Sequence, residues 1–228
     1  ADTLLFAAPD EWRALQNLGG IANVSVVPPA GAPRPVRAFD TGPGCVVIDA
    51  VTQALVPTLR RDDDGAMARR GSPLEPVVSD ALNDGFFLAD PPKSTGREQF
   101  SGAFIDRFIA SCRRARPAAT HEDIIASAVL LTARSIGDAY ARWVPNEAND
   151  VILSGGGTRN STLVDAISAA LAPRTVRIFD DVFFDAEAKE AVAFALLGYL
   201  NLMGRPGNVP SATGARGARI LGTISRHG

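Results

Sequence analysis

The chain has 228 residues, of which 46% are hydrophobic and 21% are charged, and its formal net charge at pH 7 is −2. This length fits one large domain or two small ones, with ample apolar content for a buried core. A near-neutral charge without a basic run argues against nucleic acid as the main partner. Only His121 and His227 are histidines, which argues against a Ser-His-Asp hydrolase and a histidine-rich zinc site.

Cysteine usage and hydropathy point to the cytoplasm. Cys45 and Cys112 lie far apart without C-x-x-C spacing, which fits a reducing compartment. The longest apolar stretches, 124–133 and 191–200, are about half the roughly 18 residues of a membrane span, so no membrane partner is expected. No signal peptide is expected either. The start at Ala1 suggests a processed product or a piece of a longer protein.

Three β-rich runs precede the first predicted helix. The runs lie at 14–18, 21–27 and 36–39, and the helix lies at 45–56. Gly19-Gly20 between the first two runs is typical of a β-hairpin, because its tight turn needs positive φ. The third run ends at Asp40, which a Thr-Gly-Pro-Gly sequence connects to the helix.

Helices and strands alternate in the rest of the chain. The patterns predict helices at 73–82, 104–114, 120–143, 161–171 and 186–203, and strands at 151–153 and 175–179. Thr120 and Asp123 fit a capping box at the start of the longest helix, and the charged segment 60–71 is predicted to be a surface connection. Strands first, followed by alternating helices and strands, indicate an α/β domain with a mixed sheet.

The first of two glycine-rich turns, Gly19-Gly20, has two interpretations. A simple tight turn is the commoner use of such a pair. Alternatively, its backbone N–H groups cradle phosphate oxygens. In that case Asn17 and Asn23 flank the turn as polar contacts.

The second turn, Gly155-Gly156-Gly157, follows a predicted strand and precedes a helix. Such a turn aims a helix N-terminus at an anion or a nucleotide, although helix–strand packing explains three glycines equally well. The turn is not a Walker A sequence, and Asn160 stands where a dinucleotide fingerprint needs its third glycine. Asp180, after the next strand, lies roughly where a dinucleotide-binding fold keeps its ribose-binding acid.

Several charged side chains also lie in candidate positions. Asp40, at a predicted strand end, could act as a general base or a metal ligand, or simply cap the following helix. Lys93 and Arg97 could bind a phosphate or a carboxylate, or be solvated in their loop. Lys189 and Glu190 form either a polar helix surface or a close packing contact with another segment.

Six motifs, in this order, resemble those of the anhydro-N-acetylmuramic acid kinase family. They lie at Leu15–Asn23, Phe39–Gly44, Pro92–Glu98, Ser154–Asn160, Ala188–Ala191 and Pro206–Ala215. The resemblance implies a ribonuclease-H-like lobe of the sugar-kinase, heat-shock-chaperone and actin-like ATPase superfamily, in which two lobes hold MgATP. It also implies a reaction in cell-wall recycling. Water opens the ring of 1,6-anhydro-N-acetylmuramic acid while ATP phosphorylates O6, giving N-acetylmuramate 6-phosphate.

The resemblance further implies roles for single residues. Asp40 would activate the ring-opening water, and Glu190 would lie near the sugar. The remaining matches are nucleotide contacts: a phosphate hairpin formed by Asn17, Gly19, Gly20 and Asn23, and an adenosine-side loop formed by Gly155, Gly156, Gly157 and Asn160. The implied partners are ATP with Mg²⁺ and the anhydro amino sugar, the full-length protein would be a homodimer, and no protein side chain is assigned as a metal ligand.

Two features depart from the family pattern. Cys45 stands where the family usually has Asn, so one polar contact expected near Asp40 is missing. The N-terminal lobe with its first phosphate loop is also missing. We therefore expect residues 1–228 to be a single C-terminal lobe, with weak nucleotide binding and no turnover on its own.

Two other functions stay open on the sequence. One is a non-sugar nucleotide-binding or chaperone-like ATPase module of the same superfamily; the other is a dinucleotide-binding oxidoreductase built on 151–181. Among the 23 basic residues only Lys93 and Lys189 are lysines, and both lie in family motifs. This pattern suggests that those two sites need a compact ammonium rather than a planar guanidinium.

Overall fold

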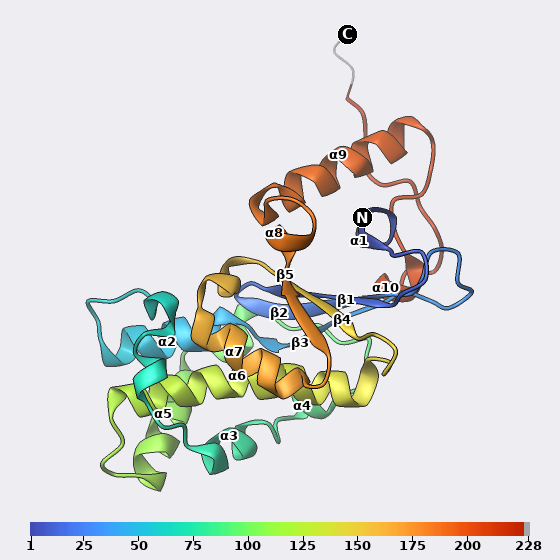
Figure 1. The fold of residues 1–228 in the computed structure, drawn as a ribbon. Helices are drawn as coiled ribbons and strands as arrows, with labels where there is room; N and C mark the ends of the chain where they lie inside the picture. Colours follow the sequence, from blue (N-terminus) through green and yellow to red (C-terminus); the bar gives the residue numbers. More distant parts are fainter. Residues whose placement is uncertain (226–228) are drawn as a thin grey trace.

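A five-stranded mixed sheet forms the centre of the molecule (Figure 1). The computed structural model describes residues 1–225, so His227 lies outside the described residues. The strands are β1 (Arg13–Leu18), β2 (Ile21–Val27), β3 (Arg37–Pro43), β4 (Asp150–Ser154) and β5 (Thr175–Ile178). Their order is β3-β2-β1-β4-β5. The first three form an antiparallel meander, while β4 and β5 run parallel to β1. The predicted α/β class with a mixed sheet is confirmed, and this topology is that of a ribonuclease-H-like lobe.

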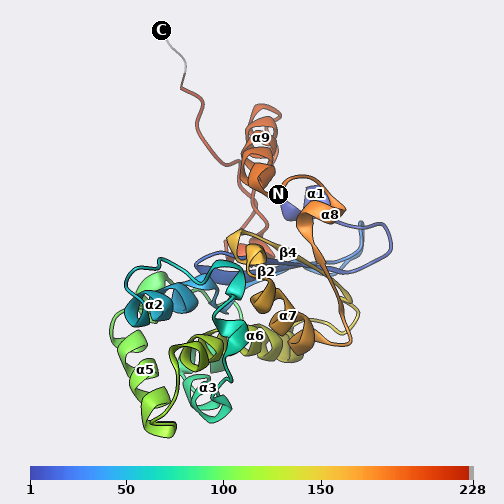
Figure 2. The ribbon, with the colours of Figure 1, turned by 60° about the vertical axis from the view of Figure 1, so that its left-hand side comes forward.

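Six helices pack on one face of the sheet (Figures 1 and 2). They are α2 (Cys45–Leu55), α3 (Glu75–Ala81), α4 (Gly85–Leu88), α5 (Ala103–Ala115), α6 (His121–Trp143) and α7 (Ser161–Leu171). The central helix is α6, whose Ile124, Leu131 and Ile136 are fully buried. By length and composition α6 alone among the described helices could span a membrane, but 72% of its most apolar stretch is buried inside the fold. It is the core helix of this layer.

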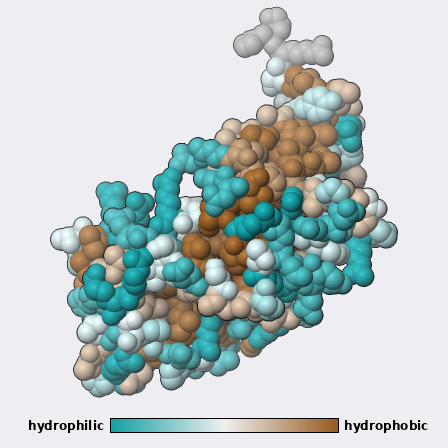
Figure 3. Space-filling view, viewed as in Figure 1, coloured by the Kyte–Doolittle hydropathy of each residue, from teal (hydrophilic) through white to brown (hydrophobic). Residues whose placement is uncertain are grey.

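The opposite face of the sheet carries a smaller layer (Figure 2). It contains α1 (Asp2–Phe6), α8 (Phe179–Val182), α9 (Lys189–Leu202) and the short α10 (Pro210–Thr213). Phe6 and Phe179 pack edge to face at 5.1 Å between ring centroids and, with Leu15, belong to a second, aromatic core. Helix α9 extends beyond this core and leaves large apolar side chains exposed, which Figure 3 shows gathered at one end of the molecule.

The segment 60–71 is a mostly exposed connection between α2 and α3, as its charge predicts, but it encloses one buried carboxylate. It forms two 3-10 turns, Asp63–Gly65 and Ala68–Arg70, around the buried carboxylate of Asp62. That carboxylate accepts hydrogen bonds from the backbone N–H groups of Met67 (2.8 Å) and Ala68 (2.9 Å). A carboxylate satisfied in this way can be buried at low cost, and the second turn packs against α6.

The capping box at the start of α6 is confirmed. The Thr120 hydroxyl accepts from the Asp123 N–H, and the Asp123 carboxylate accepts from the Thr120 N–H, both at 3.1 Å. Asp123 also accepts from the Ser72 N–H at 2.7 Å. These hydrogen bonds, that from Ser72 first, hold the pKa of Asp123 below its ordinary value.

This lowered pKa gives a pH-dependent contribution to stability. Because the folded-state pKa of Asp123 lies below the unfolded one, its stabilisation is present above about pH 4 and is lost as pH falls through the folded value. We expect Asp123→Asn to lower the free energy of unfolding at pH 7 and to match the unsubstituted chain near pH 2, measured by urea unfolding. Asp138→Asn, at an exposed site on the same helix, is the control. A constant difference between the two curves at every pH would contradict the prediction.

Candidate functional site

Four polar side chains form a row across four adjacent strands. Asp40 on β3 pairs with Asn23 on β2, Asn23 pairs with Asn17 on β1, and Asn17 pairs with Ser154 on β4. Directly paired residues project from the same face of a sheet. That face is the one where Leu15, two residues before Asn17, contacts the aromatic core.

Strand β3 continues past Asp40 to Pro43, so the expectation that it ends at Asp40 is wrong. The register between β2 and β3 shifts between Ala22 and Asn23, which leaves Thr41 as the extra residue of a β-bulge. The alternative that Asp40 caps the next helix is also wrong, because the N-cap of α2 is Gly44 and no side chain caps it. Asp40 is therefore a carboxylate held inside a strand.

The loop after α4 fixes one oxygen of this carboxylate. Oδ2 of Asp40 accepts from the Ser94 hydroxyl at 2.9 Å and from the Thr95 N–H at 2.8 Å. The Asp40 N–H in turn donates to the Lys93 carbonyl at 3.1 Å, along the free edge of β3. No donor among the described residues 1–225 forms a hydrogen bond with Oδ1 of Asp40. It is left as a proton acceptor of defined orientation.

A buried glutamine supports the bulge from the other face of the sheet. Gln16 has 0% of its surface exposed, and its Nε2 donates to the Asn23 carbonyl at 3.0 Å and to the Thr41 hydroxyl at 3.4 Å. The Thr41 hydroxyl donates onward to the Ala22 carbonyl at 3.1 Å. Sequence reasoning missed Gln16, which lies in an apparently apolar run. The one signal was a polar residue at a position where the alternation places the core.

Three neighbouring hollows surround the row. The first, the hairpin cleft, has a volume of about 470 Å³ and is lined by Gly19, Gly20, Gly156, Gly157 and Asn160. The second, the asparagine cleft, has about 880 Å³ and is lined by Asn17, Asn23, Gly155, Gly156 and Glu190. Asp40 and Asn23 line a third hollow of about 360 Å³, the Asp40 pocket. Gly156 is shared by the first two hollows, and Asn23 by the last two. The hollows thus bring all ten predicted site residues together.

The hairpin cleft is built on a close contact between the β1–β2 turn and helix α2. The Gly19 carbonyl accepts from the Cys45 N–H at 2.8 Å, and the Gly20 carbonyl accepts from the N–H groups of Gly44 (2.9 Å) and Val46 (3.2 Å). A Cβ at Gly44 would collide with the Gly19 carbonyl. The carbonyls of the turn thus cap α2 and are not available to a ligand.

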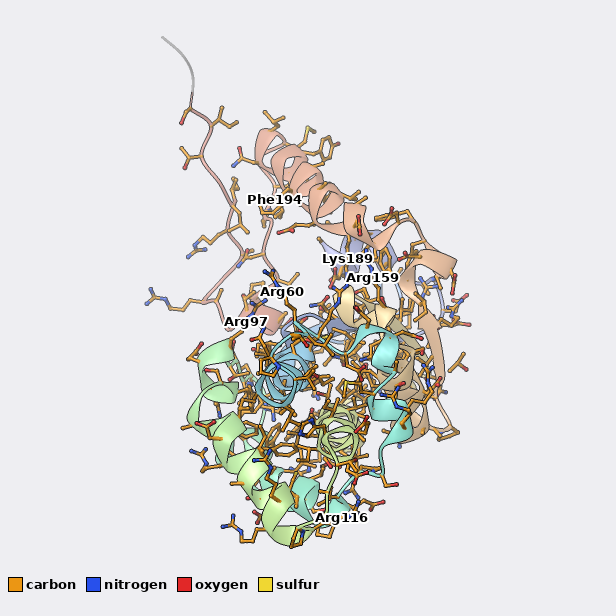
Figure 4. The ribbon with its side chains drawn as sticks, turned by 90° about the vertical axis from the view of Figure 1, so that its left-hand side faces the viewer. Arg60, Arg97, Arg116, Arg159, Lys189 and Phe194 are labelled. Atoms are coloured by element: carbon orange, nitrogen blue, oxygen red, sulfur yellow. The ribbon has the colours of Figure 1, made fainter. Side chains whose placement is uncertain are left out.

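Two arginines at the hairpin cleft have no carboxylate partner within the described part of the chain. They are Arg60 and Arg97, and Figure 4 shows them close together beside α2. The Arg97 side chain lies against Gly20, because a Cβ there would come within 2.6 Å of the Arg97 Nε. Arg61, by contrast, pairs with Asp63 at 2.7 Å. Arg97 matches one of the predicted anion-binding candidates, whereas nothing in the pattern of the sequence distinguished Arg60.

Two titratable side chains of α2, those of Cys45 and Asp49, also line the hairpin cleft. Burial raises the pKa of the Cys45 thiol to about 11, so the thiol is protonated at neutral pH. Burial also raises the pKa of Asp49, against the opposing effect of Arg61. Cys45, which stands where the family usually has Asn, lines the hairpin cleft, whereas Asp40 lines the Asp40 pocket.

Gly155 is required by the geometry of the asparagine cleft. It has a φ of +91°, and a Cβ there would come within 2.6 Å of the Asn17 Oδ1. Gly157 is needed for packing, since its Cβ would come within 2.7 Å of the Leu18 Cβ, whereas Gly156 faces open space. Close packing therefore explains Gly155 and Gly157 but not Gly156. Asn160 caps α7 by accepting from the Leu163 N–H at 2.9 Å.

The two lysines have similar surroundings. Lys93 Nζ donates to the carbonyls of Phe86 and Phe87, which engages two of its three donors, and the residue also lines the Asp40 pocket. Lys189 Nζ lies 5.2 Å from the ring centroid of Phe179 and 3.4 Å from the Ser154 hydroxyl. In Figure 4 it lies beside Arg159, and both residues line the asparagine cleft.

Glu190 is exposed in the first turn of α9 and lines the asparagine cleft. Asp180, the candidate ribose-binding acid, lines it too. Its carboxylate accepts from the Ala186 N–H at 3.0 Å and so stabilises the turn before α9. No group of three or more His, Cys, Asp or Glu side chains suited to a metal ion occurs in the part of the chain that the structure describes.

The glycine triplet allows a matched stability test. We expect Gly155→Ala to destabilise the fold by about 1–3 kcal/mol, because alanine is strained at its positive φ. Gly156→Ala should stay within about 0.5 kcal/mol of the unsubstituted chain, because its Cβ meets nothing within 4 Å. Thermal and urea unfolding of both variants measure the difference, and equal losses would contradict it.

Comparison with known proteins agrees with these observations. The family model described as anhydro-N-acetylmuramic acid kinase matches residues 1–227. A relative of that name from Salinibacter ruber is 44% identical over 98% of this chain and 56% of its own length. One from Bacillus cereus is 38% identical over 99% of this chain and 59% of its own length. The chain thus spans less than two thirds of these relatives.

A solved structure of the activator of 2-hydroxyisocaproyl-CoA dehydratase from Clostridium difficile with bound ADPNP also matches. It is 18% identical over 77% of this chain and 56% of its own, with a TM-score of 0.47. The match of the family model over nearly the whole chain, together with the order of the motifs around the three hollows, establishes the family. The chain belongs to the anhydro-N-acetylmuramic acid kinase family.

Proposed function

We propose that residues 1–228 are the C-terminal lobe of a two-lobed, ATP-dependent sugar kinase. The full-length enzyme would open 1,6-anhydro-N-acetylmuramic acid with water and phosphorylate O6, giving N-acetylmuramate 6-phosphate. The observation that carries this proposal is the row from Asp40 to Ser154, which connects two glycine turns and a fixed carboxylate on neighbouring hollows. A reaction that combines phosphoryl transfer with water activation needs both features.

The hairpin cleft is proposed to take the nucleotide. Gly19 and Gly20 would contact the phosphates, while Gly156, Gly157 and Asn160, together with Gly155 from the adjoining asparagine cleft, would hold the adenosine side. Arg60 and Arg97 would add positive charge there, and guanidinium groups suit phosphate oxygens. Phosphoryl transfer depends mainly on positioning and charge neutralisation, so little covalent chemistry is needed from the protein.

Mg²⁺ fits this site as a metal bound through the nucleotide. The described residues offer no cluster of three metal-ligating side chains. Mg²⁺ in such sites is commonly held by substrate phosphates, water and one or two carboxylates. When bound, it would neutralise charge on the phosphates. Asn17 and Asn23 would orient the reacting groups by hydrogen bonds from the strands below.

Asp40 is the proposed general base. Oδ2 is fixed by two donors, so Oδ1 can accept a proton from a water molecule that attacks C1 of the sugar. The C1–O6 bond would break as the water oxygen bonds to C1. O6 would then bond to the γ-phosphorus of ATP as the bond from that phosphorus to the β-phosphate oxygen breaks, which releases ADP. Glu190 would contact the sugar at the rim of the asparagine cleft. No step requires histidine.

The exposed apolar side of α9 supports the proposal that the full-length protein has an N-terminal lobe. Phe194 is 65% exposed and Leu202 is 73% exposed, with Tyr199 and Met203 beside them. Monomeric proteins rarely leave such patches uncovered, and the relatives are longer than this chain. The full-length protein is proposed to be a homodimer that acts in peptidoglycan recycling in the cytoplasm, where free thiols such as Cys45 and Cys112 persist.

The role of Asp40 is tested in the two-lobed protein. We expect Asp40→Asn to lower kcat by about 10²-fold or more, as for loss of a general base, with ATP affinity nearly unchanged. Asp106→Asn, at an exposed site on α5, controls for the loss of a carboxylate. Turnover assays with the anhydro sugar and calorimetric ATP titrations give the two quantities. Near-normal turnover of Asp40→Asn would remove Asp40 from the mechanism.

The nucleotide preference and the fragment claim are tested with the chain itself. We expect the isolated chain to bind ATP more weakly than the two-lobed protein and to show no turnover, because half of the cleft is missing. Titration with NAD should give no binding in either protein. Preferential NAD binding would support the oxidoreductase alternative, and ATPase activity without sugar dependence would support the chaperone-like one. Appreciable sugar phosphorylation by the isolated chain would contradict the claim that it is inactive.

A further inference from the structure

Lys93 is half-buried at the edge of the Asp40 pocket and is held by contacts with the protein on several sides. Its Nζ donates to the Phe86 carbonyl at 3.0 Å and to the Phe87 carbonyl at 3.2 Å. The same atom lies 4.1 Å from the ring centroid of Trp143 and 4.8 Å from that of Phe86. An ammonium has three donors and a compact charge, and here two donors and the charge are engaged by the fold. Lys93 is therefore an anchor.

The segment that Lys93 anchors is the one that holds Asp40. Lys93, Ser94 and Thr95 are consecutive, and each contacts Asp40 through a different group: a carbonyl, a hydroxyl and a backbone N–H. Ser94 is exposed and Thr95 only half-buried. The Thr95 hydroxyl donates to the Gln99 Oε1 at 2.6 Å, and the Lys93 ammonium fixes the other end of the segment.

The other end of the anchor is also tied to Asp40. The Trp143 ring packs edge to face on Phe39 at 5.9 Å between centroids, and Phe39 precedes Asp40 on β3. The Trp143 Nε1 donates to the Asp90 carboxylate at 3.1 Å. Lys93 thus connects the loop to Trp143, the ring on which Phe39 of β3 packs.

We propose that Lys93 is a positioning residue for Asp40. By fastening residues 93–95 to Trp143 and to the carbonyls of Phe86 and Phe87, it keeps both donors on Oδ2 and leaves Oδ1 for the water. This inference rests on the proposed role of Asp40 as general base. A displacement of about 1 Å in a reacting group can cost about 10²-fold in rate, so an anchor of this kind affects catalysis without contacting substrate.

A compact ammonium suits this position better than a guanidinium. Nζ lies over two aromatic rings and donates to two consecutive carbonyls, a space that a planar fork cannot fill in the same way. Burial lowers the pKa of Lys93 to about 8, with Arg142 acting in the same direction and Asp90 opposing it. The ammonium form still predominates at pH 7.

The first test measures the anchor without any activity. Amide hydrogen exchange of the chain is followed by NMR at Thr95, whose N–H donates to Asp40. We expect Lys93→Gln to speed exchange at Thr95 about tenfold and Lys93→Arg to lie between it and the unsubstituted chain. Asp40→Ala, which removes the acceptor, sets the upper limit. Leu153 in the core and the variant Arg113→Gln, at an exposed site on α5, serve as controls. Unchanged exchange at Thr95 in Lys93→Gln would overturn the proposal.

The second test is a double-mutant cycle in the two-lobed protein. Lys93→Gln should lower kcat about tenfold with KM changed less than about twofold, and Lys93→Arg should recover part of the loss. In an Asp40→Asn background Lys93→Gln should lower kcat no further. The same tenfold loss in both backgrounds would overturn the proposal, because Lys93 would then act independently of Asp40. Normal turnover of Asp40→Asn alone would instead refute the proposed role of Asp40 as general base. Hydrogen exchange at Thr95 would still test whether Lys93 holds residues 93–95 in place.

Discussion

The pairing of Asn23 with Asp40, next to the bulge at Thr41, is the contact on which the site depends. Side chains alternate between the two faces of a strand, so a shift by one residue would turn Asp40 toward the helices. The bulge sets this register, and the buried Gln16 holds it by hydrogen bonds to Asn23 and Thr41. The face that carries the row from Asp40 to Ser154 is thus determined by polar contacts made from the other face of the sheet.

The same arrangement explains why the three hollows adjoin one another. Asn23 lines both the asparagine cleft and the Asp40 pocket, and Gly156 lines both the asparagine cleft and the hairpin cleft. Both residues lie at or next to the row of polar side chains, on strand β2 and just after β4. Ligands placed in neighbouring hollows would therefore contact shared residues: Gly156 and Arg159 between the hairpin and asparagine clefts, and Asn23 between the asparagine cleft and the Asp40 pocket.

Local patterns were sufficient to predict most of the elements. The hairpin around Gly19-Gly20, the capping box of Thr120 and Asp123, and the strands on either side of α7 follow from turn chemistry and periodicity. The glycine turns and Asp40 could be found in the same way, because their residue types are unusual at those positions. The structure then places them around one row on the sheet.

Features that depend on contacts distant in sequence could not be predicted. In the sequence Asp62 is one of several charged residues in a polar segment. In the structure its carboxylate is buried and accepts hydrogen bonds from the backbone that folds around it. Lys93 reads as a candidate ligand-binding lysine because nothing local shows that Trp143 lies beside it. Arg60 lines the hairpin cleft only because α2 and the segment 60–64 come together there in the folded chain. In each case the partner that fixes the role is supplied by tertiary packing.

The capping of α2 by the carbonyls of Gly19 and Gly20 makes the hairpin turn and the helix a single stiff unit. The Thr132 hydroxyl of α6 donates to the Gly44 carbonyl at 2.9 Å, which extends this unit to the core helix. A force on the turn is therefore transmitted through backbone hydrogen bonds to the middle of the hydrophobic layer. A Gly-Gly turn is flexible on its own, but here its hydrogen bonds to α2, and those of Gly44 to α6, hold it in place.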